Sequence, residues 1–168
     1  MIGGAITGHA WVFGDDIDTD QLAPGLYMKG GVEAMAAHCL ESADPRFAKE
    51  VARGDMVVGG DNFGMGSSRE QAAMALNALG VGAVVARSFA RIFYRNAVNL
   101  ALPVLVCAEA GRIAAGDRLT VDPAAGTIRD ETQGIDLACD PLPDHLLALI
   151  ADGGLIPHLK KKLAARAS

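Results

Sequence analysis

Hydrophobic residues in the middle of the chain form short continuous runs, separated by segments of helical spacing. The runs cover residues 56–59, 83–86 and 103–107, and the helical patterns cover residues 69–79 and 88–99. Strands without alternating polar positions are typical of parallel sheets that are covered on both faces. The pattern therefore predicts a parallel β-α-β-α-β core with right-handed crossovers.

The two ends of the chain carry different signals. An acidic, glycine-punctuated stretch over residues 14–25 is expected to be a loop, and a Pro-Ala-Ala-Gly segment predicts a hairpin. The other expected elements are a strand over 5–13 or two strands broken at Gly8, helices over 31–39, after the N-cap Asp44, over 143–152 and over the basic tail 157–167, and hairpin strands over 118–122 and 127–131. These patterns predict an α/β fold with antiparallel pieces at both ends of the parallel core.

Composition narrows the class of protein. The 168 residues are 51% hydrophobic and 21% charged, which predicts a single domain over residues 1–168 with a substantial core. A net charge of −5 disfavours a nucleic-acid binder. No apolar run is long enough to cross a membrane, and the first four residues do not begin a signal peptide. The widely spaced Cys39, Cys107 and Cys139 form no disulfide framework, so we expect a cytoplasmic protein.

The segment between the first core strand and the next helix carries the candidate chemistry. It reads Asp-Asn-Phe-Gly-Met-Gly-Ser-Ser-Arg-Glu over residues 61–70, at the strand end where ligands bind in parallel α/β sheets. Gly64 and Gly66 allow close approach of the backbone, and Arg69 suits a carboxylate. Together they predict an anion site that contains a serine.

A structural role for the serines is equally open at this point. Ser67 and Glu70 stand in capping-box spacing, and so do Ser68 and Gln71, while Ser88 is expected to cap the following helix. One helix needs only one cap, so one of the two adjacent serines is left over.

Three common nucleotide and calcium motifs are incomplete, and a serine-hydrolase elbow is absent. No Gly-Lys-Ser/Thr follows the first glycines, and the third glycine of a dinucleotide fingerprint is replaced by Arg69. The Asp16, Asp18 and Asp20 series lacks the turn glycine and closing glutamate of a calcium loop. Ser67 lacks the Gly-x-Ser-x-Gly context, which argues against a self-sufficient hydrolase.

Several blocks together resemble the swivel domain of the aconitase superfamily. They are the Asp18-Thr19-Asp20 region within residues 14–25, the segment 62–70, the Ser-Phe-Ala-Arg-Ile-Phe-Tyr-Arg-Asn segment 88–96 and the Gly-Gly-Leu-Ile segment 153–156. The blocks keep the order and spacing that they have in this family, and they extend over nearly the whole chain. A free-standing domain of this length is similar to isopropylmalate dehydratase small subunits. The resemblance implies an aconitase-type swivelling β/β/α fold.

The resemblance also implies a function and a partner. It implies a hydro-lyase that isomerises a small hydroxy-dicarboxylate by dehydration and rehydration, as in leucine biosynthesis, together with a large subunit that carries a [4Fe–4S] cluster. No cofactor and no metal are expected on this chain, because its three cysteines lack the spacing of cluster ligands. A non-catalytic anion-binding module is the alternative from a different class.

The residue roles implied by the resemblance are specific. Ser67 matches the base that removes the carbon-bound proton, Asp20 matches a residue that supports proton transfer, and Ser68 and Arg69 match carboxylate-binding positions. Lys29 lies in the segment that matches the substrate-recognition loop, where it is either a ligand for a distal carboxylate or a solvated lysine. Small subunits of homoaconitase and dimethylmalate dehydratase therefore remain alternatives.

Overall fold

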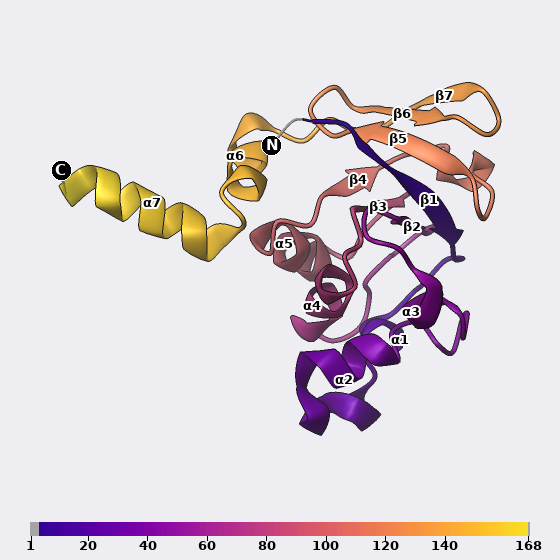
Figure 1. Ribbon diagram of the computed structural model, residues 1–168, viewed down its shortest axis with the longest axis horizontal. Coiled ribbons are helices and arrows are strands. Elements are labelled where there is room, and N and C mark those ends of the chain that lie inside the picture. Colours follow the sequence, from indigo (N-terminus) through magenta and orange to yellow (C-terminus); the bar gives the residue numbers. More distant parts are fainter. Residues whose placement is uncertain (1–3, 168) are drawn as a thin grey trace.

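The computed structural model describes residues 4–167 and contains a seven-stranded mixed sheet in the order β4-β3-β2-β1-β5-β6-β7 (Figure 1). Strands β1 to β4 pair in parallel, and β1, β5, β6 and β7 pair antiparallel. The strands are β1 Ile6–Val12, β2 Met56–Val58, β3 Ala83–Ala86, β4 Val104–Val106, β5 Arg118–Asp122, β6 Thr127–Asp130 and β7 Ile135–Ala138. The parallel core that the hydrophobic runs predicted is therefore confirmed.

Two hydrophobic clusters explain why the parallel strands are apolar on both faces. Val57 and Val84 pack with residues of the helices, whereas Met56, Val58 and Val85 pack with residues of the antiparallel strands. The sheet curls so that β5, β6 and β7 lie over one face of the parallel strands, while helices cover the other (Figure 1). The result is the β/β/α layering that the resemblance implied.

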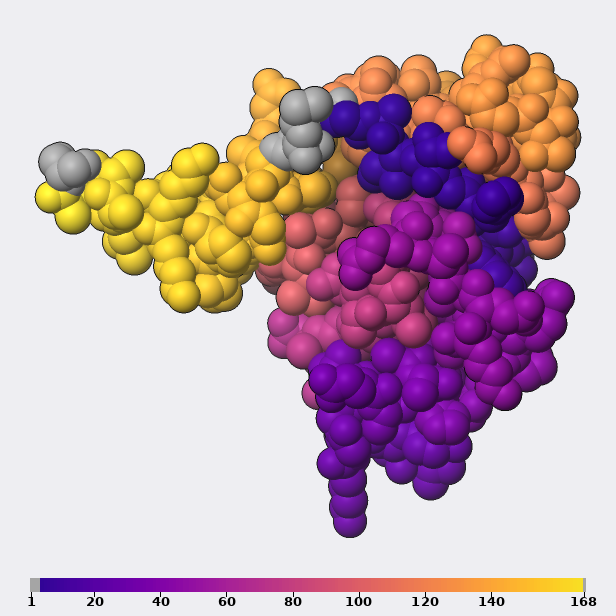
Figure 2. Space-filling model, in the orientation of Figure 1, coloured from indigo at the N-terminus to yellow at the C-terminus, as the bar shows by residue number. Residues whose placement is uncertain are grey.

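The helices follow most of the expected pattern. They are α1 Thr19–Leu22, α2 Gly31–Ala37, α3 Phe47–Glu50, α4 Gln71–Ala78, α5 Arg91–Asn99, α6 Asp144–Ala151 and α7 Leu155–Ala167, with 3-10 helices η1 Gly25–Gly30 and η2 Ala110–Arg112. Helix α7 projects away from the body of the molecule (Figures 1 and 2). Within residues 4–167 no helix is both long and apolar enough to span a membrane. The expectation that no signal peptide begins the chain concerned residues 1–4, and of these only Gly4 belongs to the described residues.

Of the two alternatives for residues 5–13, the structure has the single strand: β1 runs through Gly8 without a break, and glycine is required there because a Cβ atom would collide with the carbonyl oxygen of Gly54. Several other local predictions were wrong. Ser88 does not cap α5; its Oγ accepts a hydrogen bond from the Asn62 backbone N–H at 2.8 Å instead. The segment predicted as a loop contains the short helix α1, and β7 was not anticipated.

Candidate active site

The candidate site lies where three segments that follow β1, β2 and β3 meet at the carboxyl edge of the parallel strands. Asp18 after β1 forms a bridge with Met65 after β2, and Phe63 forms another with Phe89 after β3. The Gly64 N–H also donates to the Ile17 carbonyl at 2.7 Å. These backbone contacts fix the segment that carries the serines against the segment that carries α1.

Helix α1 is the element that organises this edge. Asp18 accepts a hydrogen bond from the Gln21 N–H at 2.8 Å, and the Gln21 side chain accepts one from the Asp18 N–H at 2.9 Å. This reciprocal capping box stabilises a four-residue helix that would otherwise be too short to persist. The acidic residues that suggested a loop are therefore partly a helix cap.

Ser67 is held by Thr19, the first residue of α1. The Ser67 N–H donates to Thr19 Oγ1 at 3.2 Å, and the two hydroxyl oxygens lie 3.3 Å apart. The Thr19 side chain is buried, whereas Ser67 is exposed. Thr19 was not identified as a site residue from the sequence, although it stands between the two aspartates of the quoted motif.

Arg69 is oriented by the far end of the same helix. Its Nη1 donates to Asp20 Oδ1 at 3.2 Å and to the Ala23 carbonyl at 2.8 Å. The Gly25 N–H donates to the same Asp20 oxygen at 3.0 Å. The hydrogen bond from Gly25, followed by that from Arg69, lowers the pKa of Asp20, so this carboxylate stays ionised beside the guanidinium.

The capping interpretation of the adjacent serines was wrong. Helix α4 begins only at Gln71 and has no side-chain hydrogen bond at its N-cap. Both Ser67 and Ser68 are exposed, and the only hydrogen bonds described for the pair are those of Ser67 with Thr19. The hydroxyl groups of Ser67 and Ser68 therefore do not cap the N-terminus of α4.

The glycines of this segment serve a steric purpose. Gly64 and Gly66 have φ angles of +85° and +110°, a region that other residues rarely adopt. A Cβ on Gly64 would collide with the Phe93 ring, and one on Gly66 would lie 3.0 Å from Thr19 Oγ1. The close neighbours of these glycines are protein atoms, and the approach of a ligand to this backbone stays a prediction.

Arg87 is a second residue that the sequence did not reveal. It donates from Nε and Nη2 to both oxygens of Asp61 at 3.1 and 3.2 Å, and from Nη2 to Asp15 at 2.7 Å. This guanidinium lowers the pKa of Asp61, and the two carboxylates raise its own pKa. Arg87 thus links the segments that follow β1, β2 and β3.

Lys29 lies in η1 and is exposed, and within residues 4–167 its side chain makes no hydrogen bond or ion pair. Its predicted role as a ligand is not tested by this arrangement.

The cysteines do not fit an iron–sulfur cluster. Cys39 belongs to the core on the helical side of the sheet, whereas Cys107 and Cys139 belong to the core on the other side. Burial raises the pKa of all three thiols, that of Cys139 to about 12, which disfavours the thiolate form that binds iron. Within residues 4–167 no three His, Cys, Asp or Glu side chains are grouped to hold a metal ion.

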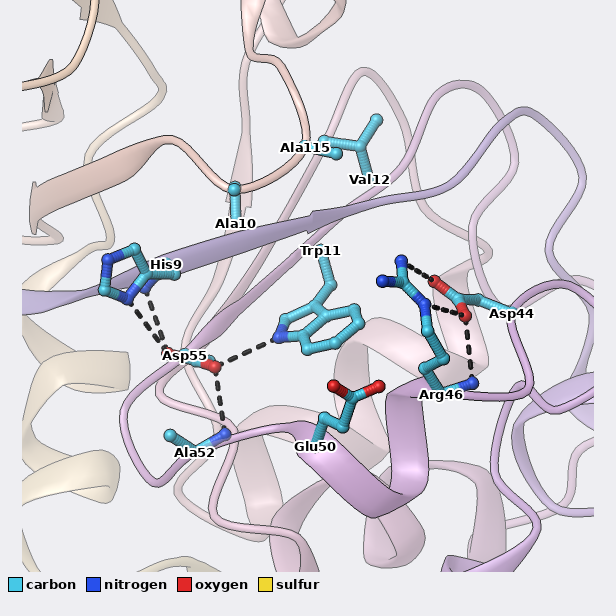
Figure 3. Close-up of a pocket in the computed structure, with 11 residues that line it drawn as sticks. His9, Ala10, Trp11, Val12, Asp44, Arg46, Glu50, Ala52, Asp55 and Ala115 are labelled. Atoms are coloured by element: carbon cyan, nitrogen blue, oxygen red, sulfur yellow. Dashed lines mark hydrogen bonds and ion pairs between the residues drawn. The ribbon is translucent and has the colours of Figure 1, made fainter.

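A cavity of about 500 Å³ lies away from this edge, between β1, α3 and the segment before β5 (Figure 3). Its floor is Asp55, which accepts hydrogen bonds from the Trp11 indole, the Ala52 N–H and the His9 N–H. None of the three segments that form the candidate site, including the one with Ser67 and Arg69, lines this cavity. We therefore describe this cavity, called the Trp11 cavity below, as a separate feature.

Comparisons with known proteins point to one family. Residues 37–109 match the family described as the aconitase C-terminal domain. The chain is 48% identical over 158 residues to 3-isopropylmalate dehydratase small subunit 2 of Archaeoglobus fulgidus, covering 93% of this chain and 95% of that protein. It is 45% identical over 163 residues to the methanogen homoaconitase small subunit of Methanothermobacter thermautotrophicus, covering 95% and 94%.

A solved structure agrees. The crystal structure of 3-isopropylmalate dehydratase from Methanocaldococcus jannaschii superposes with a TM-score of 0.92 at 39% identity, covering 97% of this chain and 98% of that one.

Proposed function

This chain belongs to the family of 3-isopropylmalate dehydratase small subunits, and we propose that it interconverts 2- and 3-isopropylmalate as one subunit of a two-subunit hydro-lyase. The observation that carries the proposal is the set of contacts by which α1 holds both Ser67 and Arg69 at the edge of the parallel strands. The assembled enzyme serves leucine biosynthesis in the cytoplasm.

In the proposed reaction Ser67 is the base. As an alkoxide it takes the proton from the substrate carbon, whose C–H electrons form the double bond as the hydroxyl group leaves the neighbouring carbon. A free serine is far too weak a base for this step, so its anionic form must be stabilised. We assign this stabilisation to the charge of Arg69 and to the backbone amides of the glycine-rich segment, beside any hydroxyl donor in contact with Ser67.

Arg69 and Ser68 bind a substrate carboxylate in this proposal. Only Nη1 of Arg69 is engaged by protein acceptors, and no bond from its Nε or Nη2 occurs within the described chain. These donors suit a bidentate carboxylate contact. Asp20 keeps Arg69 in place and, through its remaining oxygen, supports proton transfer by a histidine of the partner.

The exposure of Ser67 supports the need for a large subunit. Stabilising an alkoxide electrostatically requires a site from which water is excluded, whereas Ser67 and Ser68 are both open to solvent. We therefore propose that the large subunit covers this edge and supplies the [4Fe–4S] cluster, which would act as the Lewis acid for the leaving hydroxyl. The cysteines of this chain give no support to a cluster held here.

Homoaconitate is the second candidate substrate. The relative named methanogen homoaconitase small subunit is 45% identical to this chain, and an exposed cation, Lys29, lies in the segment after α1. Dimethylmalate and a non-catalytic anion-binding role are the remaining alternatives. The balance of relatives named 3-isopropylmalate dehydratase favours isopropylmalate.

The test is reconstitution with a candidate large subunit. The purified chain is mixed with a cluster-loaded isopropylmalate dehydratase large subunit, and turnover of isopropylmalate, homoaconitate and dimethylmalate is measured. We expect turnover of isopropylmalate by the mixture and none by this chain alone, which should be colourless. Near four iron atoms per chain after anaerobic reconstitution of the chain alone, or turnover without a large subunit, would contradict the proposed division of the active site.

A further inference from the structure

Thr19 makes two contacts with one residue, and both run through its hydroxyl oxygen. Oγ1 lies 3.2 Å from the Ser67 backbone nitrogen and 3.3 Å from Ser67 Oγ. A backbone N–H can only donate, so Thr19 Oγ1 is the acceptor in the first contact. The threonine proton is therefore free to point at a second acceptor, and Ser67 Oγ lies within reach.

This arrangement favours the anionic form of Ser67. A hydroxyl that accepts one hydrogen bond becomes a better donor in the next, because chains of hydrogen bonds polarise one another. The chain here starts at the N–H of Ser67, passes through Thr19 and ends at the Ser67 oxygen. When Ser67 is neutral, 3.3 Å is a long and weak contact; with an alkoxide it becomes charge-assisted and shorter.

Thr19 is fixed in place independently of Ser67. Its N–H donates to the Met65 carbonyl at 2.8 Å, its carbonyl accepts from the Ala23 N–H at 2.9 Å, and it is only 4% exposed. The approach of the serine segment also depends on Gly66, where a Cβ would crowd Thr19 Oγ1 at 3.0 Å. The hydroxyl is thus held ready before any substrate binds, as preorganised stabilisation of charge requires.

We propose that Thr19 is a positioning residue for the reaction: it orients Ser67 and donates a hydrogen bond to the Ser67 oxygen when that oxygen is ionised. Thr19 keeps its own proton throughout and does not touch the substrate. The inference rests on the proposed role of Ser67 as the base.

The experiment compares Thr19→Val with Thr19→Ser in the reconstituted two-subunit enzyme. Valine keeps the shape and removes the hydroxyl, so kcat should fall by roughly 10- to 100-fold, less than the ~10²–10³ seen for a short oxyanion-hole donor, with KM within about twofold. Hydrogen bonding to an ionised group lowers its pKa. Without the donor, the rising limb of the pH profile of kcat/KM should therefore move to higher pH, and Thr19→Ser should restore most of the rate.

A second measurement does not depend on the function. In the isolated chain, hydrogen exchange of the Ser67 amide should be at least about tenfold faster in Thr19→Val than in wild type, because its acceptor has been removed. Unchanged amide exchange, a kcat within twofold of wild type, or an unmoved pH profile would each overturn the role of Thr19. If exchange responds as expected but the wild-type complex turns over none of the three substrates, the proposed function fails while the contact stands.

Discussion

Asp55, directly before β2, and Asp20, in α1 after β1, are two carboxylates with different roles. Asp55, at the floor of the Trp11 cavity, has a side chain that is 8% exposed and accepts three N–H donors from β1 and the preceding turn (Figure 3). Asp20 has a side chain that is 72% exposed and shares one oxygen between Gly25 and Arg69.

The difference separates structural from functional polar groups. Both oxygens of Asp55 are engaged by protein atoms, so this residue ties β1 to the start of β2 and has little left to offer a ligand. Within the described residues one carboxylate oxygen of Asp20 has no hydrogen-bond partner, and the hydroxyl group of Ser68 has none either. The Trp11 cavity therefore has a carboxylate whose oxygens are already engaged by protein donors, whereas the exposed edge that carries Ser67 has one with an oxygen still available.

The strongest test of this contrast is Ser67→Ala in the reconstituted enzyme. Removing the base should lower kcat by about 10²–10⁴-fold, while the melting temperature changes by less than about 2 °C, because Ser67 is exposed and caps no helix. Kinetics and thermal unfolding of the same preparations check this. Ser68→Ala is the matched control and should mainly raise KM; near wild-type turnover of Ser67→Ala would show that the base has been assigned to the wrong residue.

Asp55→Ala should have the opposite profile. It leaves the Trp11 indole, Ala52 and His9 N–H groups without their acceptor, and each unsatisfied buried donor costs about 1–3 kcal/mol. With partial hydration from the cavity, we expect a loss of roughly 2–4 kcal/mol in the free energy of unfolding, measured in urea. Asp44→Ala removes a surface ion pair with Arg46 and one hydrogen bond from the Arg46 backbone N–H, and it should cost only about 1 kcal/mol; equal losses would remove the distinction.

The parts of the fold that could be predicted are those that local pattern determines. Runs such as residues 83–86 are apolar on both faces, which indicated parallel strands directly. Strand β7 was not predicted because it has only four residues, with Ile135 and Leu137 on one face and Asp136 and Ala138 on the other, which is too short for a clear alternation. Helix α1 escaped because its stability comes from a capping box and from contacts with a segment more than 40 residues away.

The same limit applies to the candidate site. The segment 61–70, with Ser67 and Arg69, could be singled out because glycine, serine and arginine after a buried strand form a pattern that can be recognised from neighbouring residues alone. Thr19 and Arg87 could not, since their significance lies in contacts with Ser67 and with Asp15 and Asp61 across the sheet edge. Whether a serine caps a helix also depended on where α4 begins, which sequence pattern leaves uncertain by a few residues.

Asp20→Asn probes the exposed carboxylate through pH. Its pKa is lowered in the folded chain by Gly25 and then Arg69, so its stabilising contribution is fully present above the ordinary carboxyl pKa of about 3.9 and is lost as the pH falls through the lowered value. Because Asp20 is exposed, we expect the variant to be less stable by under ~1 kcal/mol at pH 7. Urea unfolding should show that difference shrinking in acid; a difference that grows in acid would contradict the sign.

The smallest effect is expected for Lys29→Leu, which tests how far the site extends beyond Asp20. Lys29 is exposed in η1 and has no described partner, and flexible lysines usually keep their charge in water. We therefore expect kcat/KM for isopropylmalate and for homoaconitate to stay within a factor of about two, as for a surface substitution. If the ammonium instead contacts the variable group of the substrate, leucine would suit an isopropyl arm, each buried CH₂ contributing about 0.8 kcal/mol. It would also remove a charge-assisted hydrogen bond of roughly 1.5–3 kcal/mol to a distal carboxylate. A selective loss of homoaconitate turnover by more than tenfold would then place Lys29 in the site and shift the preferred substrate away from isopropylmalate.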